Sequence, residues 1–227
     1  MCGRFALNTS AEDLTKVFQI VGDVPAIVAR YNVAPSQAIA AVRRVAGEEG
    51  RRLVLLKWGL VPAWAKDPEI GARMINARAE SAAEKPSFRD ALKKRRCLIP
   101  ASGFYEWREI AGRKVPHFIQ RSDLQPLAFA GLWESWRSPD GASLESCTIL
   151  TTEANDLLKP LHDRMPVILD PSAFDAWLDP TQTNVELLKP LLRPFASEAL
   201  SVFPVSLRVN SPKNDDPSCI EPAAAPS

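Results

Sequence analysis

The chain has 227 residues, 46% hydrophobic and 24% charged, which is the composition of a folded globular protein with a substantial core. Its 28 lysines and arginines nearly balance 27 aspartates and glutamates, which excludes a broadly basic surface, so a polyanion site would have to be a local cluster of arginines. No apolar run reaches the roughly 18–20 residues of a membrane span, and no basic and apolar N-terminal stretch suggests a secretory signal.

The predicted elements are short, because 20 prolines punctuate the chain. In the first half, Thr9 and Glu12 form a capping box that opens a helix, with an apolar face of Leu14, Val17, Phe18 and Val21. Strands are predicted at residues 2–7, 39–45 and 53–58, and a turn-like polar segment at residues 31–35. Residues 59–75 are rich in proline and glycine and indicate a long ordered loop, which is more often functional than idle.

In the second half, a basic helix is predicted at residues 86–94 and short helices at residues 154–161, 172–178 and 185–192. Strands are predicted at residues 97–101, 104–109, 115–120, 127–136, 146–152 and 200–205. No repeat or linker divides the chain. We therefore expect an α+β single domain (residues 1–222) on a curved, barrel-like, mostly antiparallel sheet with short peripheral helices. A disordered tail is expected at residues 223–227.

The four cysteines, Cys2, Cys97, Cys147 and Cys219, lie far apart, without a C-x-x-C pair, and the chain has only two histidines. This spacing argues against a structural zinc site and gives no support to a disulfide framework. We expect no metal, no cofactor and a reducing, intracellular compartment.

Cys2 is the most informative residue. If Met1 is trimmed, Cys2 carries an α-amine beside its thiol, and near neutral pH roughly a tenth or more of such an amine is uncharged. The amine can form an imine with an aldehyde, and the thiol can close the imine into a five-membered thiazolidine. The alternative is that Met1 stays and Cys2 is a small buried strand residue, which Cys2 taken alone favours.

Three further segments carry polar residues that a pure core pattern would not place there. Asn76, Arg78 and Glu80 alternate, so on an extended chain they project from one face; the alternative is an exposed strand edge. Glu106 lies between two aromatic residues, where partial desolvation would favour the neutral acid, although a solvated outer-face glutamate is commoner. His162 follows a predicted helix and can carry protons, or can simply complement the helix dipole.

Together these segments make the chain resemble the SRAP family, named for SOS response-associated peptidases and understood as abasic-site-processing proteins. The resemblance spans essentially the whole chain and rests on several separate motifs in the right order. The matching segments are Cys2-Gly3-Arg4-Phe5, Tyr31-Asn32-Val33-Ala34-Pro35, Trp58-Gly59-Leu60-Val61-Pro62, Ile75-Asn76-Ala77-Arg78-Ala79-Glu80, Gly103-Phe104-Tyr105-Glu106-Trp107 and His162-Asp163-Arg164-Met165-Pro166.

The resemblance implies covalent capture of abasic sites in single-stranded DNA. It implies that Cys2 is the linking residue, with possible lyase and crosslink-reversal activities, and that the protein is cytoplasmic, nucleoid-associated when bound to DNA, and a monomer. The other implied catalytic residues are Asn76 (hydrogen bonding), Glu106 (acid–base) and His162 (proton transfer). The implied DNA-binding residues are Arg4, Arg78, Arg164, Asn32 and Trp64. Some members carry a second tryptophan after the one at Trp64, but here Ala65 follows.

Two other functions stay open on the residues alone. An N-terminal-nucleophile amidohydrolase or self-processing peptidase also uses Cys-Gly after methionine removal, with the α-amine as the base for the thiol. A non-covalent single-strand-binding module with a structural Cys2 is the second. A serine hydrolase is disfavoured, because the chain has no G-x-S-x-G motif.

Overall fold

A closed five-stranded barrel forms the larger half of the protein. The computed structural model describes residues 2–223. The barrel strands pair in the order β10-β4-β3-β6-β9, and β9 pairs back with β10. These strands are β3 (Ala38–Arg43), β4 (Arg52–Trp58), β6 (Arg96–Ala101), β9 (Leu127–Arg137) and β10 (Ser143–Glu153). All pairs in the ring are antiparallel except β10 with β4.

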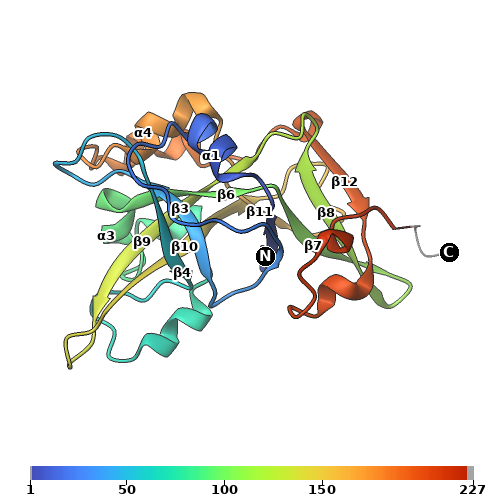
Figure 1. Ribbon diagram of the computed structural model, residues 1–227, viewed down its shortest axis with the longest axis horizontal. Helices are drawn as coiled ribbons and strands as arrows, with labels where there is room; N and C mark the ends of the chain where they lie inside the picture. Colours follow the sequence, from blue (N-terminus) through green and yellow to red (C-terminus); the bar gives the residue numbers. More distant parts are fainter. Residues whose placement is uncertain (1, 224–227) are drawn as a thin grey trace.

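A second, fully antiparallel sheet lies beside the barrel, with strand order β12-β8-β7-β1-β2. Its strands are β1 (Phe5–Leu7), β2 (Arg30–Val33), β7 (Gly103–Ile110), β8 (Arg113–Arg121) and β12 (Leu200–Pro204). In Figure 1 the barrel lies to the left, this sheet to the right, and the N-terminus at their junction. The predicted α+β domain with a barrel-like, mostly antiparallel sheet is confirmed.

Aromatic residues join the two sheets. The ring of Phe5 on β1 lies 5.3 Å from that of Trp58 on β4 and 6.2 Å from that of Phe129 on β9. Phe104 on β7 reaches the same Phe129 ring at 5.8 Å. Burying these large rings is among the strongest contributions to a core, so β1 is fixed where barrel and sheet meet.

The helices are short and peripheral. The α-helices are α1 (Ala11–Phe18), α2 (Ala79–Ala82), α3 (Arg89–Lys94) and α4 (Phe174–Leu178). The 3₁₀ helices are η1 (Pro68–Arg73), η2 (Pro171–Ala173), η3 (Val185–Leu187), η4 (Lys189–Leu191), η5 (Ser197–Ala199), η6 (Leu207–Asn210) and η7 (Pro217–Cys219). Between residues 2 and 223 no helix is long and apolar enough to cross a membrane.

Several predicted elements are wrong in detail. Ser10, not Thr9, caps α1 by accepting from the Asp13 amide, and Val21 lies beyond the helix at 43% exposure. Residues 31–33, predicted as a turn, belong to strand β2, because they pair with β1. Residues 2–4 precede strand β1, although their prediction was a strand. The turn prediction at residues 31–35 was made from local residue types, whereas the pairing of β2 with β1 depends on residues more than 20 positions away.

Three predictions in the second half also change. Residues 154–161 form turns where a helix was predicted, and residues 185–192 contain two 3₁₀ turns. The predicted tail falls mostly on residues 224–227, outside the described residues. The Ala223 amide, however, donates to the Pro204 carbonyl at 2.9 Å, so residue 223 is held by β12.

The long loop of residues 59–75 is closed at its base by two glycines. Gly59 has φ of +123°, and a Cβ added there would lie 2.6 Å from the carbonyl oxygen of Gly71. The Trp58 indole donates to the Ile75 carbonyl at 2.8 Å across the same base. Strand β5 (Asn76–Arg78) begins directly after this closed base and pairs in parallel with β10.

Candidate functional site

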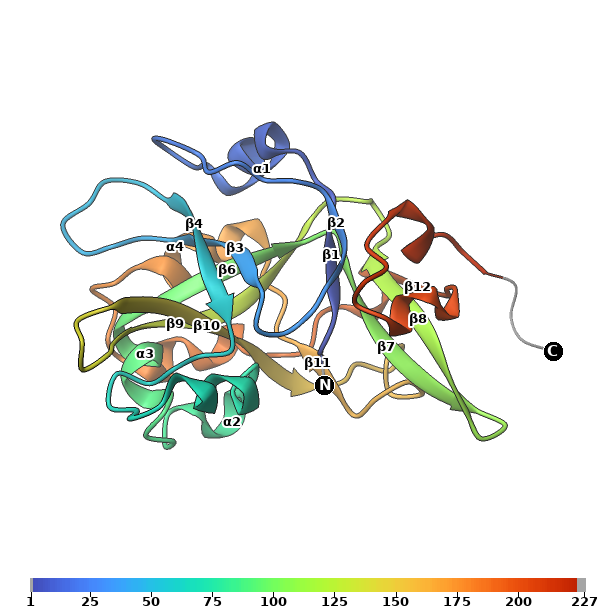
Figure 2. The same cartoon turned by 60° about the horizontal axis from the view of Figure 1, so that its bottom comes forward.

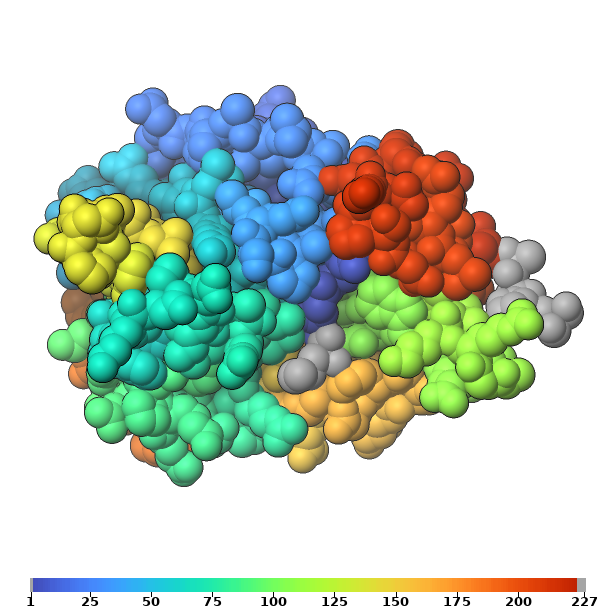
Figure 3. Space-filling view, turned by 90° about the horizontal axis from the view of Figure 1, so that it is seen from below, coloured from blue at the N-terminus to red at the C-terminus, as the bar shows by residue number. Residues whose placement is uncertain are grey.

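The start of the described chain runs along β7. Phe5 pairs with Phe104, and the Tyr105 amide donates to the Arg4 carbonyl at 3.0 Å. Continuing this antiparallel register places Cys2 and the residue after it beside Glu106. Figure 3 shows the dark-blue start of β1 in a hollow between teal, orange, green and red segments, which are far apart in the sequence.

Cys2 is fully buried, and its backbone is held by Asn76. The Asn76 side chain donates from Nδ2 to the Cys2 carbonyl oxygen at 2.9 Å. Asn76 Oδ1 is also buried, with no hydrogen-bond partner among residues 2–223. Burial raises the pKa of the Cys2 thiol, and the negative charge of Glu106 raises it further. The thiol is therefore neutral near pH 7, and an open amide acceptor lies next to it.

Glu106 is 5% exposed and shares a face of β7 with the core residue Phe104, because alternate residues of a strand point to the same side. Burial raises the pKa of its carboxyl group, and the charge of His162 opposes that shift. A depression of about 470 Å³ is lined by Glu106, Trp107, Lys114, His162 and Asn210. Glu106 is thus a buried carboxyl group that can be protonated at higher pH than usual, at the wall of an open depression.

His162 has two alternative partners for one ring nitrogen. The Arg164 amide donates to Nδ1 at 2.9 Å, which in the neutral ring leaves the proton on Nε2. Asp163 Oδ1 lies 2.8 Å from the same Nδ1 and stabilises the protonated ring. His162 Nδ1 thus has a donor and an acceptor within hydrogen-bonding distance, and the ring lines the same depression as Glu106.

The barrel strand β10 brings Arg78 and Arg164 together. Arg78 on β5 pairs with Thr151 of β10. Arg164, the first residue of strand β11 (Arg164–Pro166), pairs with Glu153, two residues further along β10. The Arg78 side chain is exposed, and its guanidinium makes no ion pair within residues 2–223. Both residues line a second depression of about 360 Å³, together with Glu153, Ala154, Lys159 and Asp163.

Arg164, in contrast, is already paired. Its two terminal nitrogens each lie 2.8 Å from an oxygen of Glu80, and Nη2 also donates to the Thr151 carbonyl at 2.6 Å. Partial burial acts to raise the pKa of Glu80, but the hydrogen bonds and charge of Arg164 hold it below the ordinary value. Glu80 belongs to helix α2, so the predicted alternation on one extended face ends at Arg78; the helical turn, not a strand, brings Glu80 to Arg164.

Arg4 and Asn32 hold the C-terminal part of the chain. Arg4 Nη1 donates to Asn32 Oδ1 at 2.7 Å and to the Val209 carbonyl at 2.8 Å. Asn32 is 0% exposed, and its Nδ2 donates to the carbonyls of Val209, Ser211 and Asn214. The DNA contact expected of Asn32 therefore has no surface in this structure, because the amide is used internally.

Trp64 is 59% exposed and lies in a turn closed by the Ala65 amide, which donates to the Pro62 carbonyl. The Trp136 indole anchors that turn by donating to the Ala65 carbonyl at 2.7 Å. A large exposed ring on an anchored turn has little entropy to lose on stacking.

Three residues at the site were given no role by the sequence: Trp107, Lys114 and Asn210. Trp107 stood in a recognised motif, so it could have been chosen. Lys114 lies in a hairpin and Asn210 in a 3₁₀ turn more than 100 residues from Glu106, and neither follows a local pattern. Within the described residues, no group of three or more His, Cys, Asp and Glu side chains could hold a metal ion.

Comparison with known proteins places this architecture in a family. Residues 1–212 match the family model described as SOS response associated peptidase (SRAP). The abasic site processing protein YoqW of Bacillus subtilis is 45% identical over 224 residues, which cover 97% of this chain and 99% of YoqW. The abasic site processing protein HMCES of Gallus gallus is 34% identical over 80% of this chain and 60% of its own length.

Solved structures agree with these sequence relationships. A crystal structure of a Bacteroides thetaiotaomicron protein superposes with a TM-score of 0.88 at 27% identity, covering 98% of this chain and all of that one. A Bordetella bronchiseptica protein gives a TM-score of 0.75 at 29% identity, covering 91% of this chain. The chain belongs to the SRAP family.

Proposed function

We propose that this protein processes abasic sites in single-stranded DNA by forming a covalent crosslink through Cys2. The observation that carries the proposal is the Cys2 corner, defined as Cys2, Asn76 and Glu106. There the segment that precedes β1 brings Cys2 close to a buried carboxyl group of raised pKa, and the Asn76 amide holds the Cys2 backbone. Relatives named as abasic site processing proteins support the substrate.

The chemistry requires removal of Met1, which gives Cys2 a free amine. Protonated Glu106 donates its proton to the sugar-ring oxygen as the bond from that oxygen to C1 breaks, and the C1 hydroxyl gives up its proton to solvent, which leaves the open aldehyde. The amine attacks C1, and loss of one water molecule leaves an imine. The Cys2 sulfur then bonds to C1 while its proton passes to the nitrogen, which closes the thiazolidine. The raised pKa of the thiol fits this order, because the amine and not a thiolate attacks first.

Asn76 and His162 complete the proposed roles. The buried Oδ1 of Asn76 can accept a hydrogen bond from the Cys2 amine or a sugar hydroxyl. His162, with a partner for each ring state, can move protons during formation or reversal of the crosslink. If thiol addition is slow, β-elimination from the imine cleaves the strand as a lyase side reaction.

DNA would be held by its phosphates and bases. Arg78 is the arginine best placed to bind a phosphate, because it is exposed and unpaired within the described residues. Arg164 is committed to Glu80, and Arg4 to Asn32 and Val209, so both are proposed mainly to position the site. Trp64 can stack on a base, a contact worth about 1–3 kcal/mol. We expect a monomer, located in the cytoplasm and at the nucleoid when bound to DNA.

The test is an SDS-resistant adduct. Purified protein, with Met1 removal verified by intact mass, is incubated with single-stranded DNA that contains one abasic site. We expect an adduct whose mass equals protein plus DNA minus one water, and its complete loss in Cys2→Ala, which should retain binding to a non-reactive tetrahydrofuran analogue. A persistent adduct in Cys2→Ala, or glutamine hydrolysis by a wild type that forms no adduct, would refute the proposal.

A further inference from the structure

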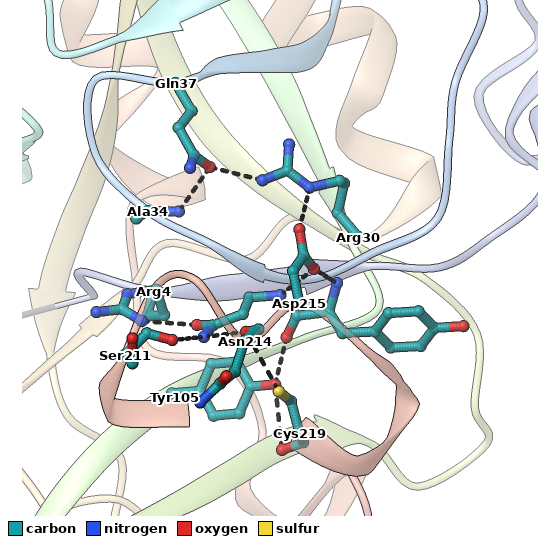
Figure 4. A network of polar contacts seen from close by, with 11 residues as sticks. Arg4, Arg30, Ala34, Gln37, Tyr105, Ser211, Asn214, Asp215 and Cys219 are labelled. Atoms are coloured by element: carbon teal, nitrogen blue, oxygen red, sulfur yellow. Dashed lines mark hydrogen bonds and ion pairs between the residues drawn. The ribbon is translucent and has the colours of Figure 1, made fainter. Parts of the chain in front are cut away.

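The C-terminal strap (residues 207–219) is tied to the strands that carry the site. Figure 4 shows its anchor, Asp215, whose carboxylate accepts from Arg30 Nε and from the backbone amides of Tyr31 and Asn32, the last at 2.9 Å. The hydrogen bonds and charge of Arg30 and the β2 amides hold the pKa of Asp215 low against the opposing effect of burial. The strap is therefore fixed relative to β2 by partly buried, charge-assisted hydrogen bonds.

The strap also contacts the site itself. Asn210 Oδ1 accepts from the Trp107 indole at 2.8 Å, and Asn210 lines the depression that contains Glu106 and His162. Since the oxygen of this amide is engaged, its Nδ2 is the end left for other partners, and it donates to no residue of the described range. The strap thus presents two amide hydrogens at the depression.

Lys114 reaches the same depression from β8. It is exposed, and its ammonium forms no ion pair with any residue between 2 and 223, although Glu109 faces it across the hairpin. Arg78 lines the other depression, and Asp163 and Arg164, which follow His162 in the chain, also lie there. Cationic and amide donors therefore line two depressions that adjoin where His162 is followed by Asp163.

We propose that Asn210 and Lys114 form a phosphodiester subsite, opposite Arg78, that binds the DNA backbone on one side of the abasic nucleotide. The inference rests on the proposed function. An ammonium and a neutral amide suit a phosphate, because both donate only hydrogen bonds toward it and neither recognises a base. The phosphate on one side of the abasic nucleotide then binds Arg78, and the phosphate on the other side binds Asn210 and Lys114.

The test uses DNA in which one charged phosphate is replaced by a neutral methylphosphonate, either 5′ or 3′ of a tetrahydrofuran abasic analogue. Binding is measured by fluorescence anisotropy for wild type, Lys114→Gln, Asn210→Asp and Arg78→Gln. Asn210→Asp keeps the acceptor for Trp107 and adds a charge that repels phosphate. Asn184→Asp is the matched control, because Asn184 is exposed, lines neither depression and caps a 3₁₀ helix, which aspartate also does.

We expect Lys114→Gln and Asn210→Asp to weaken binding of unmodified DNA about tenfold, the scale of one hydrogen bond to a charged group. Replacing the phosphate that binds Lys114 and Asn210 by a methylphosphonate should weaken binding by the wild type to a similar extent, but should not weaken binding by Lys114→Gln any further. Replacing the phosphate on the other side should weaken binding by the wild type and by Lys114→Gln, but not binding by Arg78→Gln any further. If Lys114→Gln and Asn210→Asp keep the wild-type sensitivity to both methylphosphonates, the subsite is refuted. Because binding to the analogue needs no crosslink, a wild type that binds but never crosslinks refutes only the covalent function.

Discussion

The polar side chains of the Cys2 corner are partly or fully buried and held, whereas Arg78 and Lys159 on the neighbouring basic surface are exposed to solvent. In the corner, Asn76 bonds to the Cys2 backbone and Glu106 is 5% exposed. On the basic flank, defined as Arg78, Lys159 and Arg164, only Arg164 is held by the barrel. Buried groups shift proton equilibria, and exposed cations exchange counterions. The corner should therefore control the rate of crosslinking, and the flank the concentration of DNA needed.

Glu106→Gln gives the largest expected effect. Glutamine keeps the shape but cannot donate and regain a proton, so the crosslinking rate at saturating abasic DNA should fall about 100-fold or more. Single-turnover kinetics measure it, with Glu109→Gln, exposed on the same strand, as the control. If Glu106→Gln changed the half-saturating DNA concentration and left the maximal rate unchanged, Glu106 would act in DNA binding and not in the chemical step.

The pH dependence follows from the raised pKa of Glu106. As a proton donor, Glu106 should lose its effect as pH rises through its folded pKa, whereas the Cys2 amine attacks only in its uncharged form, which is lost as pH falls. The crosslinking rate should therefore pass through a maximum, and Glu106→Gln should remove the fall on its alkaline side. The same shift affects stability: a carboxyl group with a raised folded pKa stabilises the fold fully below its unfolded pKa, and that stabilisation is lost as pH rises through the folded pKa. The Tm of Glu106→Gln should therefore be about 2–4 °C higher than that of the wild type at pH 8. At acidic pH the two Tm values should be equal.

Asn32→Ala should cost the most stability. The change removes an amide whose two Nδ2 hydrogens are shared among three backbone carbonyls, and it leaves Arg4 Nη1 without its Asn32 acceptor in a partly buried setting. We expect a loss of about 3–4 kcal/mol and a fall of about 10 °C in Tm. Urea unfolding checks this, with Asn8→Ala as control, because Asn8 is exposed and caps no helix of the described residues. An Asn32→Ala protein of wild-type stability whose DNA binding is weakened would restore Asn32 to DNA recognition.

The sequence predicted the barrel-like sheet, because alternating apolar residues mark strands such as β7 and β9 directly. It did not predict which strands pair with one another or which distant side chains come into contact. Strand β2 looked like a turn, since its ladder to β1 lies more than 20 residues away, and the pairing of Arg164 with Glu80 spans 84 residues. Residues with a local signature, such as Glu106 between aromatics, were found. Asn210 was not, because only the strap's anchoring at Asp215 brings it to the site.

Arg78→Gln tests the flank. With no ion pair to lose among the described residues, it should leave Tm within about 1 °C of wild type. It should weaken binding of abasic-analogue DNA about tenfold at low salt and reduce the slope of log affinity against log salt by about 0.7, the value for one phosphate on a single strand. Anisotropy titrations at several salt concentrations measure both, with exposed Arg193→Gln as control. If Arg78→Gln slowed the maximal crosslinking rate and left the affinity for DNA unchanged, Arg78 would act in the chemical step and not in DNA binding.

Glu80→Gln gives the smallest effect and separates the two arginines of the flank. Glu80 is half exposed, so its pair with Arg164 is worth about 1 kcal/mol at most. Loss of the pair should lower Tm by about 2–4 °C at pH 7. Because the folded pKa of Glu80 is depressed, the difference in Tm should shrink as pH falls through that pKa, where the wild-type carboxylate is protonated too.

The released positive charge on Arg164 should tighten DNA binding by Glu80→Gln about two- to threefold at low salt, because the local potential becomes more positive. Weaker binding in Glu80→Gln would instead show that Arg164 contacts DNA only while Glu80 holds its guanidinium in place, and would make the ion pair itself part of the phosphate site.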